Sequence, residues 1–285
     1  MKKSLRSKVL TGLMALSLCL SMTACGGDEP ESTTGQVPVN PLEAINFNEY
    51  HPESSTVVEP EESMLQKLVD AYNQNSDTVG WLKIDNTTID DVVVQSTANN
   101  NYYLRLNAYT KAYDWYGCYY ADCANTIGAR SSLDKNTIIY GHSMSDNPDR
   151  FGDPDRDRFS QLKKYLDVEF AKENPYIHFT TPDDDMVFQI FSVMYCDSSW
   201  NYIEPNPGTQ EFTDLINEAK MRSQINFDVQ VSSTDKILTL STCTYIYGMD
   251  NTTQRFVVMA KLLPAGTELQ ESVEATVNPN PKAPY

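Results

Sequence analysis

Three residues whose side chains can take part in nucleophilic catalysis each stand at the end of a predicted strand. Cys243 follows the apolar run 237–240, and His142 follows a similar run that ends at residue 140. Arg255 directly precedes a third run, 256–260. A cysteine thiolate is a nucleophile, a histidine ring transfers protons near neutral pH, and a guanidinium donates hydrogen bonds to an oxyanion. Since strand ends hold side chains rigidly, the three residues form a candidate catalytic site.

Taken one at a time, each of these residues is also typical of a structural role. A cysteine at a strand end is commonly a buried thiol, and an arginine at a strand start is commonly a surface charge. His142 fits a loop as well as a catalytic site, although Gly141 beside it permits a close approach of the backbone. The segment 244–254 contains glycine, aspartate and asparagine, which favour turns. We therefore expect Cys243 and Arg255 at neighbouring ends of a β-hairpin.

The elements that must position these residues are short apolar runs, which are typical of strands. The predicted strands cover residues 81–84, 91–94, 116–120, 137–140, 177–180, 187–195, 237–240 and 256–263. Helical spacing of apolar residues predicts helices over 61–75, 159–170 and 209–222, the last with Thr209 as its N-cap. About eight short strands in one domain predict a mainly β fold, a closed barrel with an N-terminal helix and flanking helices.

Four segments of the chain resemble the sortase family of enzymes, and in particular its class B. Residues 239–243 read TLSTC, which resembles the sortase nucleophile motif. Residues 140–144 read YGHSM, which resembles the class B segment YGHNM, with Ser143 where asparagine is common. FSQLKKY at 159–165 resembles the class B stretch after the histidine, and RFVV at 255–258 resembles the arginine strand of the family. The resemblance extends over residues 61–263 and has the family's order of His, Cys and Arg.

The resemblance implies a sortase-like closed β-barrel and a cysteine transpeptidase without metal or cofactor. Cys243 would be the nucleophile and form a thioester with a C-terminal sorting motif of the LPxTG or NPxTN kind. His142, as an imidazolium, would stabilise the thiolate and then protonate the leaving amine, and Arg255 would stabilise the substrate carbonyl and the oxyanion. Ser241 and Thr242 would shape the substrate groove.

The partners implied by the resemblance are exported proteins that carry a sorting signal, and an acceptor amine. The amine would belong to a peptidoglycan precursor or to a pilin lysine. A Cys-His peptide hydrolase, in which water resolves the acyl-enzyme, would use the same three residues and is the first alternative. A non-catalytic lipoprotein that binds the cell wall is the second.

The N-terminal residues predict export and attachment to a membrane. Basic residues precede a short apolar stretch and then small residues, which is typical of a signal peptide over residues 1–24. Residues 22–25 read MTAC and resemble a bacterial lipobox, which implies that Cys25 carries lipid; an uncleaved signal-anchor is the alternative. Residues 25–60 are rich in Pro, Glu, Ser and Thr and predict a flexible stalk. We expect a membrane-anchored, extracytoplasmic enzyme of a Gram-positive cell.

We place the catalytic domain at residues 61–265, followed by a tail over 266–285 that we expect to fray. The formal charge of the chain is −17, which argues against a nucleic-acid-binding surface. The acidic run 146–157 lacks the terminal glutamate of an EF-hand and predicts a solvated loop rather than a Ca²⁺ site.

The remaining cysteines do not predict a metal site or a disulfide framework. No CxxC pair is present, which argues against zinc. Cys118 and Cys123 are close enough in sequence to pair, but so tight a loop often has poor disulfide geometry. Cys196 follows the apolar run 188–195 and predicts a core thiol.

Overall fold

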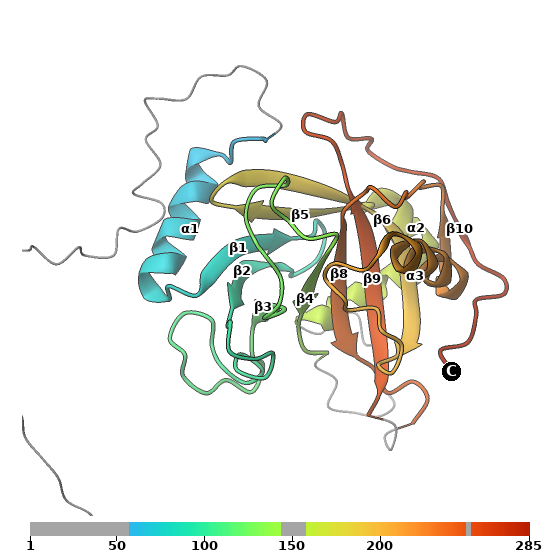
Figure 1. Cartoon of the computed structure of the whole chain (residues 1–285), viewed down its shortest axis with the longest axis horizontal. Coiled ribbons are helices and arrows are strands. Elements are labelled where there is room, and N and C mark those ends of the chain that lie inside the picture. Colours follow the sequence, from blue (N-terminus) through green and yellow to red (C-terminus); the bar gives the residue numbers. More distant parts are fainter. Residues whose placement is uncertain (1–56, 144–157, 249–251) are drawn as a thin grey trace, which may run out of the picture. The chain divides into compact units, whose positions relative to one another are not determined.

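The eight predicted strands each form one strand of a single closed barrel (Figure 1). The computed structural model describes residues 57–143, 158–248 and 252–285. Its barrel strands are β1 Thr78–Lys83, β2 Asp90–Gln95, β3 Tyr119–Ala121, β4 Asn136–Tyr140, β5 Tyr176–Thr181, β6 Asp184–Asp197, β8 Ile237–Cys243 and β9 Gln254–Leu262. Around the barrel they follow the order β1-β2-β3-β4-β8-β9-β6-β5. The predicted mainly β fold is therefore confirmed.

The strands that carry the candidate site are buried on both faces. Successive side chains of a strand point to opposite sides of the sheet. In β9, Phe256 and Val258 belong to the apolar core inside the barrel. Val257 and Met259 belong to a second core with Phe212, on helix α3 (Thr209–Arg222) outside the barrel. Because both faces need apolar side chains, β9 is a continuous apolar run without the alternation of a half-exposed strand.

The predicted helices are present, with two corrections. Helix α1 spans Glu62–Gln74 and α3 has the predicted bounds, but the N-cap of α3 is Gly208 rather than Thr209. The segment predicted as one helix over 159–170 is a 3-10 helix, η2 (Phe159–Leu166), followed by α2 (Val168–Glu173). Asp167 separates them because its backbone is extended and its side chain accepts a hydrogen bond from Glu169 N, which caps α2.

The prediction that the tail after the catalytic domain frays is wrong. Strand β10 (Ala275–Val277) pairs antiparallel with β7 (Ile225–Phe227) to form a second, two-stranded sheet. Beyond β10, the N–H of Asn278 donates a hydrogen bond to Gln224 O, and the N–H of Lys282 donates one to Met221 O, both at 2.8 Å. Three-residue strands are too short to give a periodic signal, so the sequence did not reveal this attachment.

The direction of the strands brings three chain segments to one edge of the barrel. β4 and β8 are parallel neighbours, so both end at the same edge, with Tyr140 opposite Ser241. β9 runs antiparallel to β8 and therefore starts at that edge, with Arg255 opposite Cys243. The hairpin predicted between β8 and β9 is thus present, and the residues that follow β4 lie beside it.

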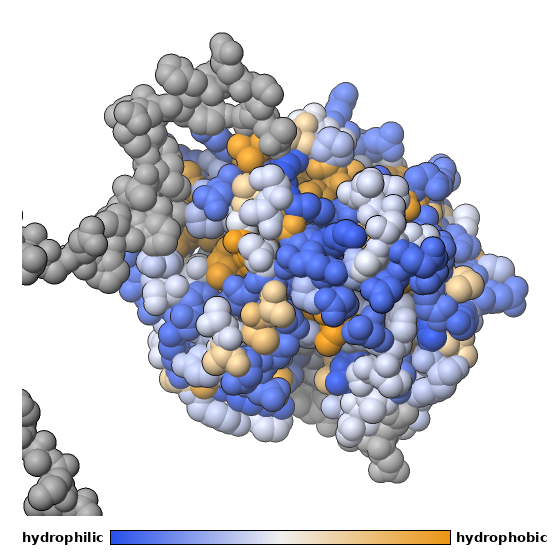
Figure 2. Space-filling model, in the orientation of Figure 1, coloured by the Kyte–Doolittle hydropathy of each residue, from blue (hydrophilic) through white to orange (hydrophobic). Residues whose placement is uncertain are grey.

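Hydrophilic residues cover most of the face seen in Figure 2, and strongly hydrophobic residues show there in small separate areas. None of the helices in the described ranges is long and apolar enough to cross a membrane. Those ranges also contain no group of three or more His, Cys, Asp or Glu side chains arranged to hold a metal. The predicted signal, Cys25, the stalk up to residue 56 and the acidic run 146–157 lie outside the described residues.

The cysteines of the described residues are all free thiols. Cys118 and Cys123 do not pair, and Cys118 is buried. Cys196 is buried in the core that α3 forms with the outer face of the barrel, as predicted.

Candidate active site

Cys243 is the last residue of β8 and the only one of that strand that is not fully buried. Arg255 lies opposite it in the β8–β9 ladder. The Nη1 atom of Arg255 donates to the carbonyl oxygens of Thr252, at 2.8 Å, and Gln254, at 2.9 Å. The guanidinium is thereby held at the strand end where the thiol becomes accessible.

His142 reaches the same edge through the parallel pairing of β4 with β8. The N–H of Gly141 donates to Ser241 O at 3.3 Å, which extends the ladder by one residue beyond β4. His142 Nε2 lies 2.6 Å from the carbonyl oxygen of Leu104. Because a carbonyl oxygen only accepts hydrogen bonds, Nε2 carries a proton, and Nδ1 is the nitrogen that can take up another.

The surroundings of His142 favour the neutral form of its ring. Burial lowers the pKa of His142 below its ordinary value of 6.5, and the positive charges of Arg105 and Arg158 lower it further. The hydrogen bond to Leu104 acts in the opposite direction and is the smaller effect. These effects disfavour the imidazolium that the sequence analysis expected.

The structure brings Cys243, His142 and Arg255 to one edge but does not join them directly. Within residues 57–143, 158–248 and 252–285, no hydrogen bond links the three side chains. Catalytic hydrogen bonds are often long in the absence of substrate and tighten when it binds. The arrangement is thus suited to a substrate that completes the contacts.

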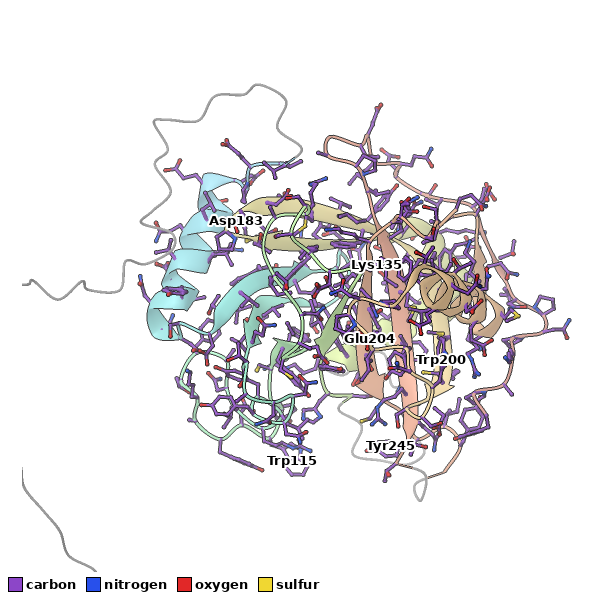
Figure 3. All side chains as sticks on the ribbon, viewed as in Figure 1. Trp115, Lys135, Asp183, Trp200, Glu204 and Tyr245 are labelled. Atoms are coloured by element: carbon purple, nitrogen blue, oxygen red, sulfur yellow. The ribbon has the colours of Figure 1, made fainter. Side chains whose placement is uncertain are left out.

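The loop between β2 and β3 covers His142, and no sequence pattern indicated this cover. Gly117 in this loop has a φ of +57°, and a Cβ atom there would lie 2.6 Å from Leu104 O and 3.1 Å from His142 Cδ2. Only glycine fits this close approach. In the same loop, the Arg105 guanidinium stacks over the exposed ring of Trp115. Figure 3 shows Trp115 at the same end of the domain as Tyr245, which lies two residues after Cys243 in the chain. The contact to His142 is made by a backbone carbonyl, so no residue type could have indicated it.

Ser241 and Thr242, the predicted substrate-binding residues, are both buried behind Cys243. The Ser241 hydroxyl forms a 2.8 Å hydrogen bond with the hydroxyl of Tyr202. Thr242 Oγ1 has no hydrogen-bond partner in the part of the chain that the structure describes. Their side chains support the strand that presents the thiol, and Tyr202 is a residue of this region that the sequence analysis did not identify.

The closed barrel of eight strands, with Cys243, His142 and Arg255 at one edge, defines a known class of enzyme. Residues 82–263 match the family model described as the sortase domain, and the chain belongs to the sortase family. It is 37% identical over 178 residues to sortase B of Listeria monocytogenes. The aligned region covers 62% of this chain and 67% of that relative. It is 32% identical over 207 residues to sortase B of Staphylococcus aureus. The aligned region covers 72% of this chain and 76% of that relative.

Solved structures of sortase B agree with this relationship. The crystal structure of the S. aureus enzyme matches with a TM-score of 0.59 at 32% identity, over 74% of this chain and 90% of that chain. A complex of S. aureus sortase B with substrate matches with a TM-score of 0.60 at 30% identity, over 71% and 87% of the two chains. The protein is therefore a class B sortase, a cysteine transpeptidase that acts on sorting motifs.

Proposed function

We propose that Cys243 is the nucleophile of this transpeptidase, with His142 as acid and base and Arg255 as the group that stabilises the oxyanion. The observation that supports these roles most is the strand register. It places the accessible thiol opposite Arg255 and beside the end of β4, from which His142 extends.

In the proposed first step the Cys243 sulfur bonds to the carbonyl carbon of threonine in a motif of the LPxTG or NPxTN kind. His142 takes the proton of the thiol on Nδ1 as the sulfur attacks. The peptide bond to the next residue then breaks, and its nitrogen leaves as an amine after His142 passes it that proton. Since Nη1 of Arg255 already binds two carbonyl groups, its Nε and Nη2 atoms are the donors for the oxyanion. Buried Ser241 and Thr242 act by shaping the strand beneath the groove.

In the second step the nitrogen of an acceptor amine bonds to the thioester carbon and the C–S bond breaks. His142 takes a proton from the amine and returns it to the sulfur of Cys243, which restores the thiol. A crystal structure of sortase B complexed with triglycine matches this chain with a TM-score of 0.60 at 30% identity. That complex supports an N-terminal glycine amine, of the kind that a peptidoglycan precursor presents, as the acceptor. We propose this amine in preference to a pilin lysine.

Mass spectrometry of the full chain with a small panel of sorting-motif peptides and triglycine tests these roles. We expect an acyl adduct on the peptide that contains Cys243, and an amide product once triglycine is added. A free acid as the main product in the presence of triglycine would instead identify a Cys-His hydrolase. An adduct at another residue would rule out Cys243 as the nucleophile.

We expect Arg255→Lys to reduce kcat for a sorting-motif peptide by a factor of about 10² to 10³, with a smaller effect on KM. A lysine keeps the charge but cannot hold two backbone carbonyls and still present further donors in a fixed plane. Steady-state kinetics with one peptide, on the variant and the parent chain, measures both constants. Turnover within twofold of the parent would remove Arg255 from the site.

We also propose that residues 1–24 direct export and that Cys25 carries a lipid, so that the stalk 25–60 tethers the domain 61–265 outside the cytoplasm. The basic N-terminus and the MTAC sequence at 22–25 support this. Cells grown with labelled palmitate are expected to label the parent chain and not the Cys25→Ser variant. Equal labelling of the two chains would contradict the lipid anchor and leave a signal-anchor as the attachment.

A further inference from the structure

The turn that follows the candidate nucleophile is held by a buried glutamine, Gln254, which the proposed reaction does not use. Residues 245–248 form this turn, in which the N–H of Gly248 donates to Tyr245 O at 3.0 Å. The side-chain Oε1 of Gln254 accepts from the N–H of Tyr247 at 2.7 Å, and its Nε2 donates to Gly248 O at 2.8 Å. Gln254 is only 1% exposed. One side-chain amide therefore binds the backbone of two consecutive residues, because it carries a donor and an acceptor on the same planar group.

The main-chain carbonyl of Gln254 connects this turn to both sides of the candidate site. It accepts from the N–H of Thr244, the residue directly after Cys243, at 3.3 Å. It also accepts from Nη1 of Arg255 at 2.9 Å. Gln254 thus binds the chain just beyond the nucleophile and, with the same residue, the guanidinium opposite that nucleophile.

The side chain of Gln254 points away from the side of the sheet on which the thiol lies. Successive residues of a strand point to opposite sides of the sheet, whereas directly paired residues of two strands point to the same side. Arg255 is paired with Cys243, so these two side chains share one side. Gln254 precedes Arg255 in β9 and therefore points to the other side, with Phe256 of the barrel core. It holds the site from behind and does not touch the reacting atoms.

Aromatic rings extend this attachment from the turn to the start of β9. The ring of Tyr247 packs edge-on against Tyr195 of β6, with ring centroids 6.1 Å apart. Tyr195 packs in the same manner against Phe256, at 5.1 Å, and Phe256 directly follows Arg255. The turn is therefore fixed to the strand that carries the guanidinium by packing as well as by hydrogen bonds.

We propose that Gln254 is a positioning residue of the transpeptidase, which fixes the Arg255 guanidinium relative to Cys243 by closing the turn 245–248 onto the start of β9. The inference rests on the proposed roles of Cys243 and Arg255. With Nη1 held by the carbonyl groups of Thr252 and Gln254, the other donors of the guanidinium keep a fixed direction toward the oxyanion. No bond to Gln254 forms or breaks during the reaction.

Gln254→Met tests this role, since methionine has a similar length and lacks both hydrogen-bonding atoms. A misplacement of about 1 Å can cost roughly 10² in rate, so we expect kcat and the single-turnover rate of acylation to fall by about 10- to 100-fold, with a smaller effect on KM. Alkylation of Cys243 by iodoacetamide needs the thiolate but no oxyanion donor, and we expect its rate to stay within about twofold of the parent. Mass spectrometry of the Cys243 peptide measures both reactions. An equal loss in alkylation, or unchanged acylation, would overturn the proposal.

A double variant shows whether Gln254 acts through Arg255. If Gln254 only positions the guanidinium, its substitution has little further effect once that guanidinium is lost. We therefore expect Gln254→Met combined with Arg255→Lys to acylate within about threefold of the rate of Arg255→Lys alone. Two losses that multiply in the double variant would show an action independent of Arg255 and would contradict the proposal.

Gln95→Met is the matched control for a purely structural effect. Gln95 Nε2 donates to the carbonyl oxygens of Asp122 and Asn125, both at 2.7 Å, so the same substitution again removes two hydrogen bonds to the backbone of a loop. Gln95 ends β2, which β3 and β4 separate from β8 around the barrel. We expect this variant to melt at a lower temperature and to acylate like the parent. An equal loss of acylation in the two methionine variants would make the role of Gln254 structural.

Gln254→Asn provides a second test in case Gln254→Met does not fold. Asparagine keeps the amide but is one methylene shorter, so it cannot reach both Tyr247 N and Gly248 O. We expect this variant to fold, to acylate more slowly than the parent and to alkylate at the parent rate. Thermal unfolding establishes that each variant is folded at the assay temperature. If both variants are unfolded there, Gln254 is structural and the proposal is wrong.

These outcomes are separate from the tests of the proposed function. If the parent chain forms its thioester on Cys243 and Arg255→Lys is slow, while Gln254→Met acylates like the parent, only the role of Gln254 fails. If Arg255→Lys acylates like the parent, the proposed role of Arg255 fails, and a slow Gln254→Met then contradicts an action through Arg255.

Discussion

Replacement of Cys243 by alanine is expected to abolish the thioester and to reduce transpeptidation by a factor on the order of 10⁶. The methyl group of alanine cannot attack a carbonyl, and Ser241 and Thr242 cannot replace the thiol because their side chains are buried. Cys243 is the last residue of its strand and is partly exposed. We therefore expect its substitution to change the free energy of unfolding by no more than about 0.5 kcal/mol. Product formation by chromatography and the thermal midpoint measure the two effects.

Cys123→Ala is the matched control for this prediction. Cys123 is also a free, partly buried thiol in the described part of the chain, but it lies in the loop after β3. Its substitution is expected to leave turnover unchanged. Transpeptidation by Cys243→Ala at more than about 1% of the parent rate would disprove the assignment, because loss of a nucleophile has a far larger effect.

Asp184→Ala is expected to reduce the free energy of unfolding by about 3–5 kcal/mol. Asp184 is fully buried, and its carboxylate accepts from Nε and Nη2 of Arg130, both at 2.8 Å. It also accepts from the backbone N–H groups of Arg130, at 2.8 Å, and Val58, at 2.9 Å. Loss of the carboxylate leaves the Arg130 charge buried without a counter-charge, in contact with the carbonyl oxygens of Leu263 and Asp185. Urea unfolding at pH 7 measures the change.

An exposed ion pair provides the comparison for Asp184. The pair between Lys83 and Asp85 has side chains that are 44% and 57% exposed, and Asp85→Ala is expected to change stability by less than about 1 kcal/mol. The double variant Arg130→Met with Asp184→Leu should recover much of the loss, since it removes both buried charges. A loss below about 1 kcal/mol in Asp184→Ala would show that water reaches the pair.

The sequence predicted the barrel well because apolar strand runs and turn residues are local signals. Each of the eight predicted runs overlaps one barrel strand, and the turn residues after Cys243 indicated the hairpin that sets Arg255 opposite it. The environment of His142 could not be predicted. Its hydrogen-bond partner is a backbone carbonyl 38 positions away, and its lowered pKa follows from burial that only the assembled loop produces.

The segment 159–170 shows a second limit, which arises from helix type. Read as an α-helix, this segment places Leu166 on the apolar face with Phe159, Leu162 and Phe170. The segment up to Leu166 is a 3-10 helix, in which residues three apart lie on one line. This geometry aligns Phe159, Leu162 and Tyr165 toward the core and leaves Leu166, which lies off that line, 38% exposed.

The parallel pairing of β4 with β8 also has a consequence for how the enzyme folds. The two strands are joined by a buried hydrogen bond of 2.6 Å from Thr239 Oγ1 to Asn136 Oδ1, between residues 103 positions apart. A chain must close a long loop before such a contact forms, and folds rich in such contacts fold slowly. The thiol of Cys243 meets the end of β4 only after this closure. The rate at which catalytic activity returns on refolding therefore reports the formation of the longest-range pairing in the barrel.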